Sequence, residues 1–234
     1  MSLETGKPFV VGFDGLHRVG KGTQANLLGE FIEEEGKSFI IVRGDGTREG
    51  LGETPGDPFS PEWQERSQRL KSYDRTVASW NLSSYILLKE LHSIIEDAAA
   101  PDVVIVDRTI VSRASFLLHR GILDTSRQAT VDELYPNATD EQDVMDAIPD
   151  VIFDLQVRGS SVLLDRLDQT DPKYEFRAEN IRGGFNASRN AHKYLPDTIK
   201  QRVQVLDAQH DPNIIQKYVR DFLLDQDFLN SKSN

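Results

Sequence analysis

The chain has 234 residues and a net charge of −11, so its acidic surface disfavours nucleic acid as a partner. The absence of cysteine excludes disulfides and thiolate zinc sites. No apolar run approaches the roughly 20 residues of a membrane span, and the N-terminus lacks a basic region followed by an apolar one. These features predict a cytoplasmic protein with no membrane partner.

Five short apolar runs, rich in β-branched and aromatic residues, predict buried strands. They cover residues 8–13, 38–43, 102–107, 150–157 and 202–207. Helical patterns lie between them, at residues 21–35, 74–99, 110–119, 160–167 and 212–224. Strand and helix alternate, with crossovers long enough for parallel pairing, which predicts an α/β fold with a doubly wound parallel sheet.

Three segments lack such patterns. Residues 43–61 are rich in glycine and proline and predict a long loop, a kind that is usually functional or disordered. Residues 167–194 are polar and rich in arginine, and they predict a mobile lid on a single 1–234 domain. Residues 121–143 are polar too, and their sequence indicates no function.

A glycine-rich loop follows the first predicted strand. From Gly15 to Lys21 the spacing is G-x-x-x-x-G-K, that of a Walker A loop. The loop lies between a strand and an amphipathic helix, where backbone N–H groups turn inward at the positive end of the helix. The alternative is a strand-to-helix turn with an incidental lysine. We predict phosphate binding by Gly15, His17, Arg18, Val19, Gly20, Lys21, Gly22 and Thr23.

A second candidate site lies at the end of the third predicted strand. Asp107 and Arg108 occupy this position, and the carboxyl ends of parallel strands face the ligand crevice of an open sheet. A carboxylate there can hold Mg²⁺ through waters beside the phosphates. The alternative is an ordinary ion pair at a strand end.

These motifs resemble thymidylate kinases along almost the whole chain. The stretches that carry the resemblance are "FDGLHRVGKGTQ", "VVIVDRTIVSRASF", "PDVIFDLQVRGSSVLLDRL" and "RVQVLDAQHDPNIIQKYVRDFL", and "GKGTQ" alone also resembles adenylate kinases. The resemblance implies a P-loop NTPase-type three-layer α/β/α fold, a five-stranded parallel sheet and a small helical lid. It also implies phosphoryl transfer from ATP and Mg²⁺ to a nucleoside monophosphate, with thymidylate as the default acceptor, and a homodimer.

The resemblance implies catalytic roles for Lys21, Arg18, Asp107 and Arg182. Thr23 and Asp107 would hold Mg²⁺, partly through water, and Arg18 would stabilise the transferred group. The lid would contribute Arg177, Arg182 and Arg189. A continuous helix would place Arg182 and Arg189 on one face, but Gly183-Gly184 between them are expected to interrupt it. Each of these arginines fits a solvated surface equally well.

The acceptor side departs from the family pattern. His17 stands where the family has an acidic residue, Ile86 stands in an arginine's place, and Leu117 replaces the polar residue that reads thymine. The candidate acceptor-binding residues are Asp14, His17, Arg43, Tyr85, Arg108 and Arg113. Two alternatives therefore stay open, a kinase for a nucleoside or other small metabolite and a nucleotide-binding protein without transfer activity.

Overall fold

The computed structural model describes residues 7–43, 48–50, 77–97, 100–138, 141–170 and 173–226. Their strands form one sheet in the order β3-β2-β4-β1-β5-β6. The five predicted strands are confirmed and pair in parallel: β1 (Phe9–Asp14), β2 (Phe39–Val42), β4 (Val103–Asp107), β5 (Val151–Gln156) and β6 (Val203–Asp207). The short β3 (Arg48–Gly50) pairs antiparallel with β2, within a segment predicted as loop.

The predicted helices are present as α1 (Lys21–Glu34), α3 (Val77–Glu96), α4 (Ile110–His119), α7 (Ser160–Asp165) and α10 (Pro212–Asp225). The outermost residues predicted for α3, 74–76 and 98–99, lie outside the described residues. Four further helical segments follow α4: α5 (Val131–Leu134), α6 (Glu141–Ala147), α8 (Tyr174–Asn190) and α9 (Asp197–Lys200), with a 3₁₀ turn η1 (Ala191–Tyr194) between the last two. None of the described helices is long and apolar enough to cross a membrane.

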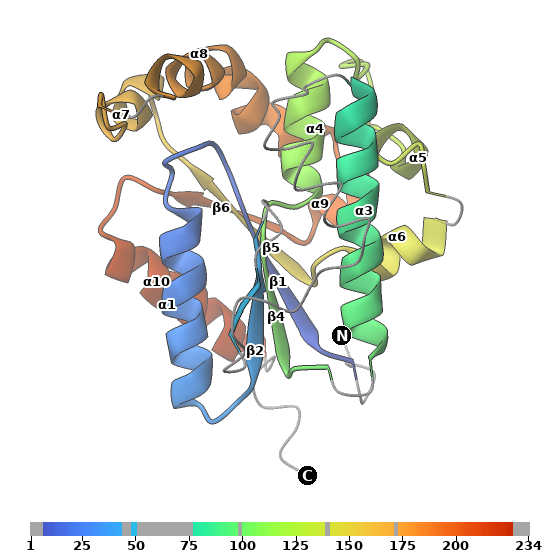
Figure 1. The fold of residues 1–234 in the computed structure, drawn as a ribbon, viewed down its shortest axis with the longest axis vertical. Coiled ribbons are helices and arrows are strands. Elements are labelled where there is room, and N and C mark those ends of the chain that lie inside the picture. The colour runs from blue at the N-terminus through green and yellow to red at the C-terminus, as the bar shows by residue number, and fades with distance from the viewer. Residues whose placement is uncertain are drawn as a thin grey trace.

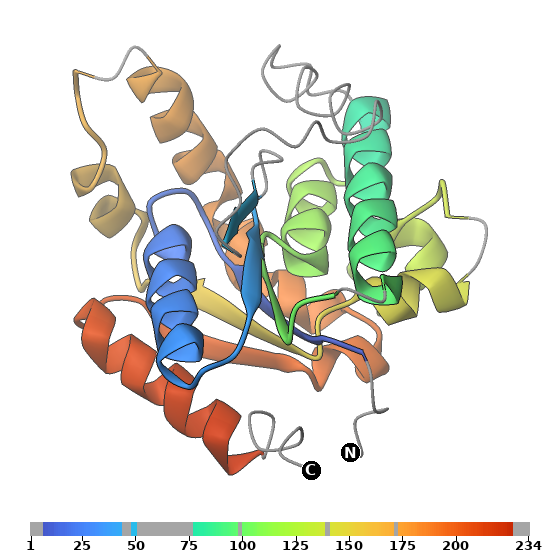
Figure 2. The ribbon, with the colours of Figure 1, turned by 60° about the horizontal axis from the view of Figure 1, so that its bottom comes forward.

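The helices cover both faces of the sheet, which gives three layers (Figure 1). Helices α1 and α10 lie on one side, and α3 and α4 lie on the other, as Figure 2 also shows from a second angle. Each face has its own hydrophobic cluster, because successive side chains of a strand point to opposite faces. Phe13 and Phe153 pack toward α1 and α10, whereas Val10 and Ile152 pack toward α3 and α4.

Helix α8 runs without a break through Gly183 and Gly184, so the expected interruption there was wrong. A Cβ on Gly183 would lie 2.9 Å from His119 Cε1, and one on Gly184 would lie 3.7 Å from Leu16 Cδ2. Glycine weakens a helix interior by about 1 kcal/mol relative to alanine, but here it permits close packing. These two positions bring α8 against α4 and the loop that follows β1.

Candidate active site

The loop between β1 and α1, residues 15–20 (the phosphate loop), turns through three residues with positive φ. These angles are 124° at Gly15, 65° at Arg18 and 112° at Gly20. Arg18 is the exception among them, because a residue with a Cβ adopts this conformation only at an energetic cost. The turn delivers the chain to the N-terminus of α1, whose first N–H groups have no partner inside the helix. Such a terminus favours an anion.

Lys21 lies buried beneath this loop. Its Nζ donates hydrogen bonds to the carbonyl oxygens of Gly15, at 3.1 Å, and Leu16, at 2.9 Å. Burial, followed by the charge of Arg108, lowers the pKa of Lys21 to about 8, although Asp107 and Asp14 oppose this change. The ammonium group is therefore held at the inner wall of the loop, where bound phosphate oxygens would favour its charged form.

His17 lies among cationic side chains. Burial and, after it, the charges of Arg177, Lys21, Arg108 and Arg18 together lower the pKa of His17 to about 4. The imidazole is therefore neutral at physiological pH. Its Nε2 is buried and has no hydrogen-bond partner in the part of the chain that the structure describes. The charges acting on His17 mark a local concentration of positive charge in a chain whose net charge is −11.

Asp107 ends β4 beside the phosphate loop, since β4 and β1 are neighbours in the sheet. Its Oδ1 is buried and accepts no hydrogen bond from the described residues. An oxygen in this state fits a magnesium ion or one of its waters. Thr23 is exposed on the first turn of α1. The described residues contain no cluster of three or more acidic or imidazole groups suited to a metal, so phosphate oxygens and water would have to complete the shell.

Arg108 follows Asp107 with φ at 82°, and its N–H donates to the Phe13 carbonyl at 2.9 Å. This bond continues the ladder between β4 and β1 past the last residue of β4. The charge of Arg108 lowers the pKa values of both Lys21 and His17. Arg108, for which the prediction was an acceptor ligand, therefore acts electrostatically on the phosphate loop.

Asp14 ends β1 and is buried, at 1% exposure. Its carboxylate accepts hydrogen bonds from the backbone N–H of Gly15 and from the N–H and hydroxyl groups of Thr109 and Ser112, at 2.6 to 3.0 Å. Burial raises the pKa of Asp14 and the charge of Asp154 raises it further, while these hydrogen bonds oppose both effects. The carboxylate, predicted as an acceptor ligand, joins the phosphate loop to the N-terminus of α4.

Arg166 is a residue that the sequence analysis did not single out. It follows α7, and its Nη1 lies 3.4 Å from the carbonyl oxygens of both Arg18 and Val19. Its Nη2 donates to the Ala208 carbonyl at 3.1 Å. One guanidinium thus braces the strained residue of the phosphate loop against the turn that follows β6. No local pattern signals this contact, because its partners lie 148 and 42 residues away.

Arg43, the candidate ligand after β2, reaches back to α1. Its Nη2 donates to Asn26 Oδ1 at 2.7 Å. Its Nη1 lies so close to Gly22 that a Cβ on this glycine would be 3.1 Å away. The strand order puts the residues after β2, β4 and β1 side by side at one edge of the sheet, so Arg43 joins Asp107 and the phosphate loop there.

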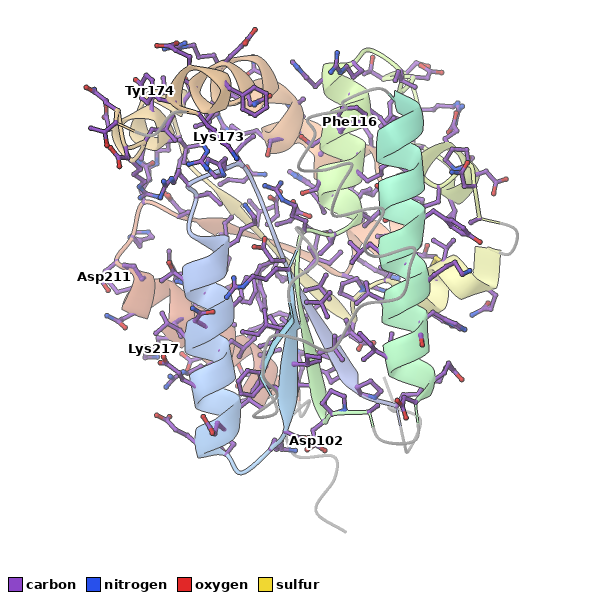
Figure 3. The ribbon with its side chains drawn as sticks, viewed as in Figure 1. Asp102, Phe116, Lys173, Tyr174, Asp211 and Lys217 are labelled. Atoms are coloured by element: carbon purple, nitrogen blue, oxygen red, sulfur yellow. The ribbon has the colours of Figure 1, made fainter. Side chains whose placement is uncertain are left out.

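The arginines of the predicted lid take different places on α8. Arg177 is half-buried and its charge acts on His17. Arg182 and Arg189 are exposed, and the guanidinium of Arg189 lies 5.7 Å from the ring centroid of Phe185. Figure 3 shows the start of α8, at Lys173 and Tyr174, at the same end of the molecule as the N-terminus of α1.

Arg113 lies in the core and not at the sheet edge. It is 2% exposed, and its Nε donates to the Leu134 carbonyl at 2.8 Å. Burial lowers its pKa to about 10. This placement in contact with α5 gives no support to the predicted phosphate contact.

The remaining acceptor candidates lie on α3 and α4. Tyr85 on α3 is half-buried, with Lys89 Nζ 5.9 Å from its ring centroid, and Leu117 on α4 is buried. The side chain of Ile86 lies outside the described residues.

Comparison with known proteins supports the resemblance. No family model matches the chain. A thymidylate kinase of Sulfurihydrogenibium sp. (strain YO3AOP1) is 24% identical over 214 residues, which cover 83% of this chain and 98% of that protein. A solved thymidylate kinase from Candida albicans matches 95% of this chain and 94% of its own, with a TM-score of 0.61 and 15% identity. One from Ehrlichia chaffeensis matches 93% of this chain and 99% of its own, with a TM-score of 0.54 and 20% identity.

Both solved structures are less than 25% identical to this chain, so they establish the fold. That fold includes the five-stranded parallel sheet predicted from the apolar runs. The resemblance predicted from the sequence motifs is confirmed: the chain is similar in sequence to a thymidylate kinase and has the fold of the solved thymidylate kinases.

Proposed function

We propose that this chain transfers the γ-phosphoryl group of ATP to a nucleoside monophosphate, with thymidine monophosphate as the default acceptor. One observation carries the proposal: the charges of Arg18, Lys21, Arg108 and Arg177 all act on His17 in the phosphate loop. This loop also opens α1, whose N-terminus favours an anion. A positive centre of this kind in an acidic chain suits a ligand with several phosphates.

In the proposed reaction, an oxygen of the acceptor phosphate attacks Pγ while the bond from Pγ to the β,γ-bridging oxygen breaks and ADP leaves. The protein contributes positioning and charge neutralisation, since this chemistry needs little covalent help. Lys21 would exchange its contacts with the Gly15 and Leu16 carbonyls for phosphate oxygens. Arg18 and the lid arginines would stabilise the transferring group, and a closed lid would exclude water.

Magnesium, when bound, would neutralise charge on the β- and γ-phosphate oxygens. Asp107 would hold it, with Thr23 beside it and water between. The Oδ1 of Asp107, which is buried and has no hydrogen-bond partner among the described residues, supports this role. Gly22 offers no hydroxyl at the usual position after the lysine, so in this chain Asp107 would carry more of the coordination.

A coupled assay of ADP formation tests the proposal. The purified chain is given ATP, magnesium and a panel of nucleoside monophosphates and free nucleosides, and the products are identified by chromatography. We expect ADP formation that depends on a monophosphate. Replacing Lys21 with Met should lower kcat about 100- to 1,000-fold, while Arg158→Ala, whose side chain is 83% exposed, serves as the matched control. Consumption of ATP that no acceptor changes would overturn the proposal.

His17 favours a second candidate, a kinase for a nucleoside or another small metabolite. A neutral imidazole with an unpartnered Nε2 can bond a hydroxyl group in either tautomer. The same panel separates the two candidates, because this one predicts turnover with an uncharged acceptor hydroxyl and little with the monophosphate. Tight binding of ATP with no product across the panel would indicate a nucleotide-binding protein without transfer activity.

A further inference from the structure

Leu16 belongs to the phosphate loop by its backbone and to the hydrophobic core by its side chain. Its carbonyl oxygen accepts a hydrogen bond from Lys21 Nζ at 2.9 Å. Its side chain is partly buried and packs against the hydrophobic cluster that contains Ala178 and Ile181 of α8. A single residue therefore connects α8 to the ammonium group of Lys21.

The contact between Leu16 and α8 is made at bare backbone. Gly184 is buried on α8, and a Cβ at this position would lie 3.7 Å from Leu16 Cδ2, an ordinary van der Waals distance. Successive residues of an α-helix point about 100° apart, and the preceding residue, Gly183, packs against His119 of α4 instead. Helix α8 is thus packed between α4 and the phosphate loop, which extends up to it in Figure 1.

The backbone of Gly15, next to Leu16, is confined by β5. Gly15 has a φ of 124°, and a Cβ there would clash with the Leu155 carbonyl oxygen. The carbonyl of Gly15 accepts the second hydrogen bond from Lys21 Nζ, at 3.1 Å. The two carbonyls that hold the ammonium group therefore belong to one dipeptide, which packs against β5 by its backbone and against α8 by its leucine side chain.

The direction of these two carbonyls matters because Lys21 is buried. A buried ammonium group is costly unless it finds acceptors, and the carbonyls of Gly15 and Leu16 supply them in the free protein. If the carbonyls turned away, the lysine side chain would leave this position and would have to be ordered again when phosphate binds. Ordering a long side chain on binding lowers affinity, whereas a side chain that is already in place does not.

We propose that Leu16 is a positioning residue through which α8 fixes the carbonyl groups that hold Lys21 in place for bound phosphate. This inference rests on the proposed function and deepens it. Helix α8 also carries Arg177, Arg182 and Arg189, so the helix that supplies the arginines and the lysine that meets the donor phosphates are held as one unit.

Calorimetric titration with ADP and with inorganic tripolyphosphate tests the proposal. Leu16→Ala removes the side chain that contacts α8 and keeps the carbonyl. It should weaken binding of both ligands about three- to tenfold, the effect expected when one long side chain must be immobilised on binding. Leu16→Met conserves the side-chain volume and should restore both affinities. Gly184→Ala should leave them unchanged, because its Cβ fits at 3.7 Å from Leu16 Cδ2.

Leu87→Ala is the matched control for a general loss of packing. Leu87 is a partly buried leucine on α3 that packs against the cluster on the other face of the sheet. Both leucine variants should lose stability, as truncated core side chains do, but only Leu16→Ala should lose affinity for the two ligands. Equal losses of affinity in Leu16→Ala and Leu87→Ala would contradict the positioning role.

A double-mutant cycle assigns the effect to Lys21. In a Lys21→Met background, Leu16→Ala should weaken ADP binding no further, because the side chain that Leu16 positions is gone. A full additional effect in that background would overturn the proposal, and so would an unchanged affinity of Leu16→Ala in the otherwise wild-type chain.

These titrations need no phosphoryl transfer. Weaker tripolyphosphate binding by Leu16→Ala, restored by Leu16→Met, supports the inference even where no acceptor is phosphorylated and the proposed function fails. Transfer by the wild type, together with equal tripolyphosphate binding by the wild type and Leu16→Ala, supports the function and overturns the inference. A wild-type chain that binds neither ADP nor tripolyphosphate also overturns it.

Discussion

Asp14 and Asp154 lie in register on the neighbouring parallel strands β1 and β5, and both carboxylates are buried. Asp14 accepts five hydrogen bonds. Asp154 Oδ2 accepts one from Gln156 Nε2 at 2.7 Å and lies 3.5 Å from His192 Nδ1, whereas its Oδ1 has no partner in the described ranges. Two buried like charges side by side oppose folding.

We predict that Asp154→Asn stabilises the protein at neutral pH by about 1–2 kcal/mol. Burial and the charge of Asp154 raise the pKa of Asp14 above its ordinary value of 3.8, so the folded state binds more protons than the unfolded state. The contribution of Asp14 to stability is therefore greatest at acidic pH and is lost as the pH rises through the folded pKa of Asp14. Removing the charge of Asp154 should remove part of this loss of stability at higher pH.

Urea unfolding of the wild type and Asp154→Asn between pH 4 and pH 8 measures this difference. The gain in unfolding free energy should shrink toward acidic pH, where Asp14 is protonated in both proteins. Asp165→Asn, an exposed carboxylate on α7, is the control and should change little. A variant that is less stable than the wild type at pH 8 would contradict the prediction.

The affinity for nucleotide should depend on the protonation of Lys21. Its pKa is about 8 in the free protein, and bound phosphates favour the charged form. Affinity for ADP should therefore fall above pH 8, approaching roughly tenfold per pH unit, because binding then takes up a proton. Calorimetric titration at pH 9 in buffers of different ionisation enthalpy should reveal this uptake. If no proton uptake is seen at pH 9 and the affinity is unchanged from pH 7 to pH 9, Lys21 does not contact the phosphates.

Replacing Gln216 with a hydrophobic residue should stabilise the protein. It is 3% exposed on α10, and neither of its amide atoms has a hydrogen-bond partner among the described residues. Burying an unsatisfied amide costs about 1–3 kcal/mol, so Gln216→Met, which has a similar shape, should raise the free energy of unfolding by about 1 kcal/mol. Chemical denaturation measures it, with Gln201→Met at an exposed position as the comparison. No gain at position 216 would mean that the amide is satisfied in solution.

Position 12 requires glycine because the N-terminus of α4 packs closely against β1 there. A Cβ at this position would lie 2.5 Å from Thr109 Cγ2 and 3.0 Å from Pro149 Cγ. Gly12→Ala should therefore destabilise the chain by about 2–4 kcal/mol. Adding Thr109→Ser removes the methyl group but keeps the hydroxyl that bonds Asp14, and it should recover part of the loss. If Thr109→Ser leaves the Gly12→Ala defect unchanged in thermal unfolding, the Thr109 contact is not its cause.

The parallel strands and the phosphate loop could be predicted because their signals are local. Runs such as residues 103–106 are apolar throughout, as strands buried on both faces must be. The glycines at 15 and 20 permit the positive φ angles that the loop adopts. The continuity of α8 could not be predicted from propensity, because Gly183 and Gly184 break helices unless a partner packs against them. That partner, His119 of α4, lies more than 60 residues earlier in the chain.

The contacts that orient the site side chains are also invisible in the sequence. The amide of Asn26 and its place on α1 do not reveal that Arg43 donates a hydrogen bond to it, since this depends on how β2 approaches the helix. Arg113 illustrates the reverse case: an arginine near a strand-end motif was predicted to meet phosphate, whereas burial between α4 and α5 directs its Nε to the Leu134 carbonyl. Spacing predicts which residues follow a strand, and packing determines where their side chains point.

The brace formed by Arg166 has a consequence for synthesis of the chain. The residues that define the phosphate loop emerge from the ribosome early, but the guanidinium that holds the carbonyls of Arg18 and Val19 comes about 150 residues later. Its other anchor, the Ala208 carbonyl, comes later still. A nascent chain that has reached only α4 contains every residue of the loop and lacks the contact that steadies it. The phosphate loop is therefore braced only near the end of translation, after β6 and the turn that follows it have been synthesised.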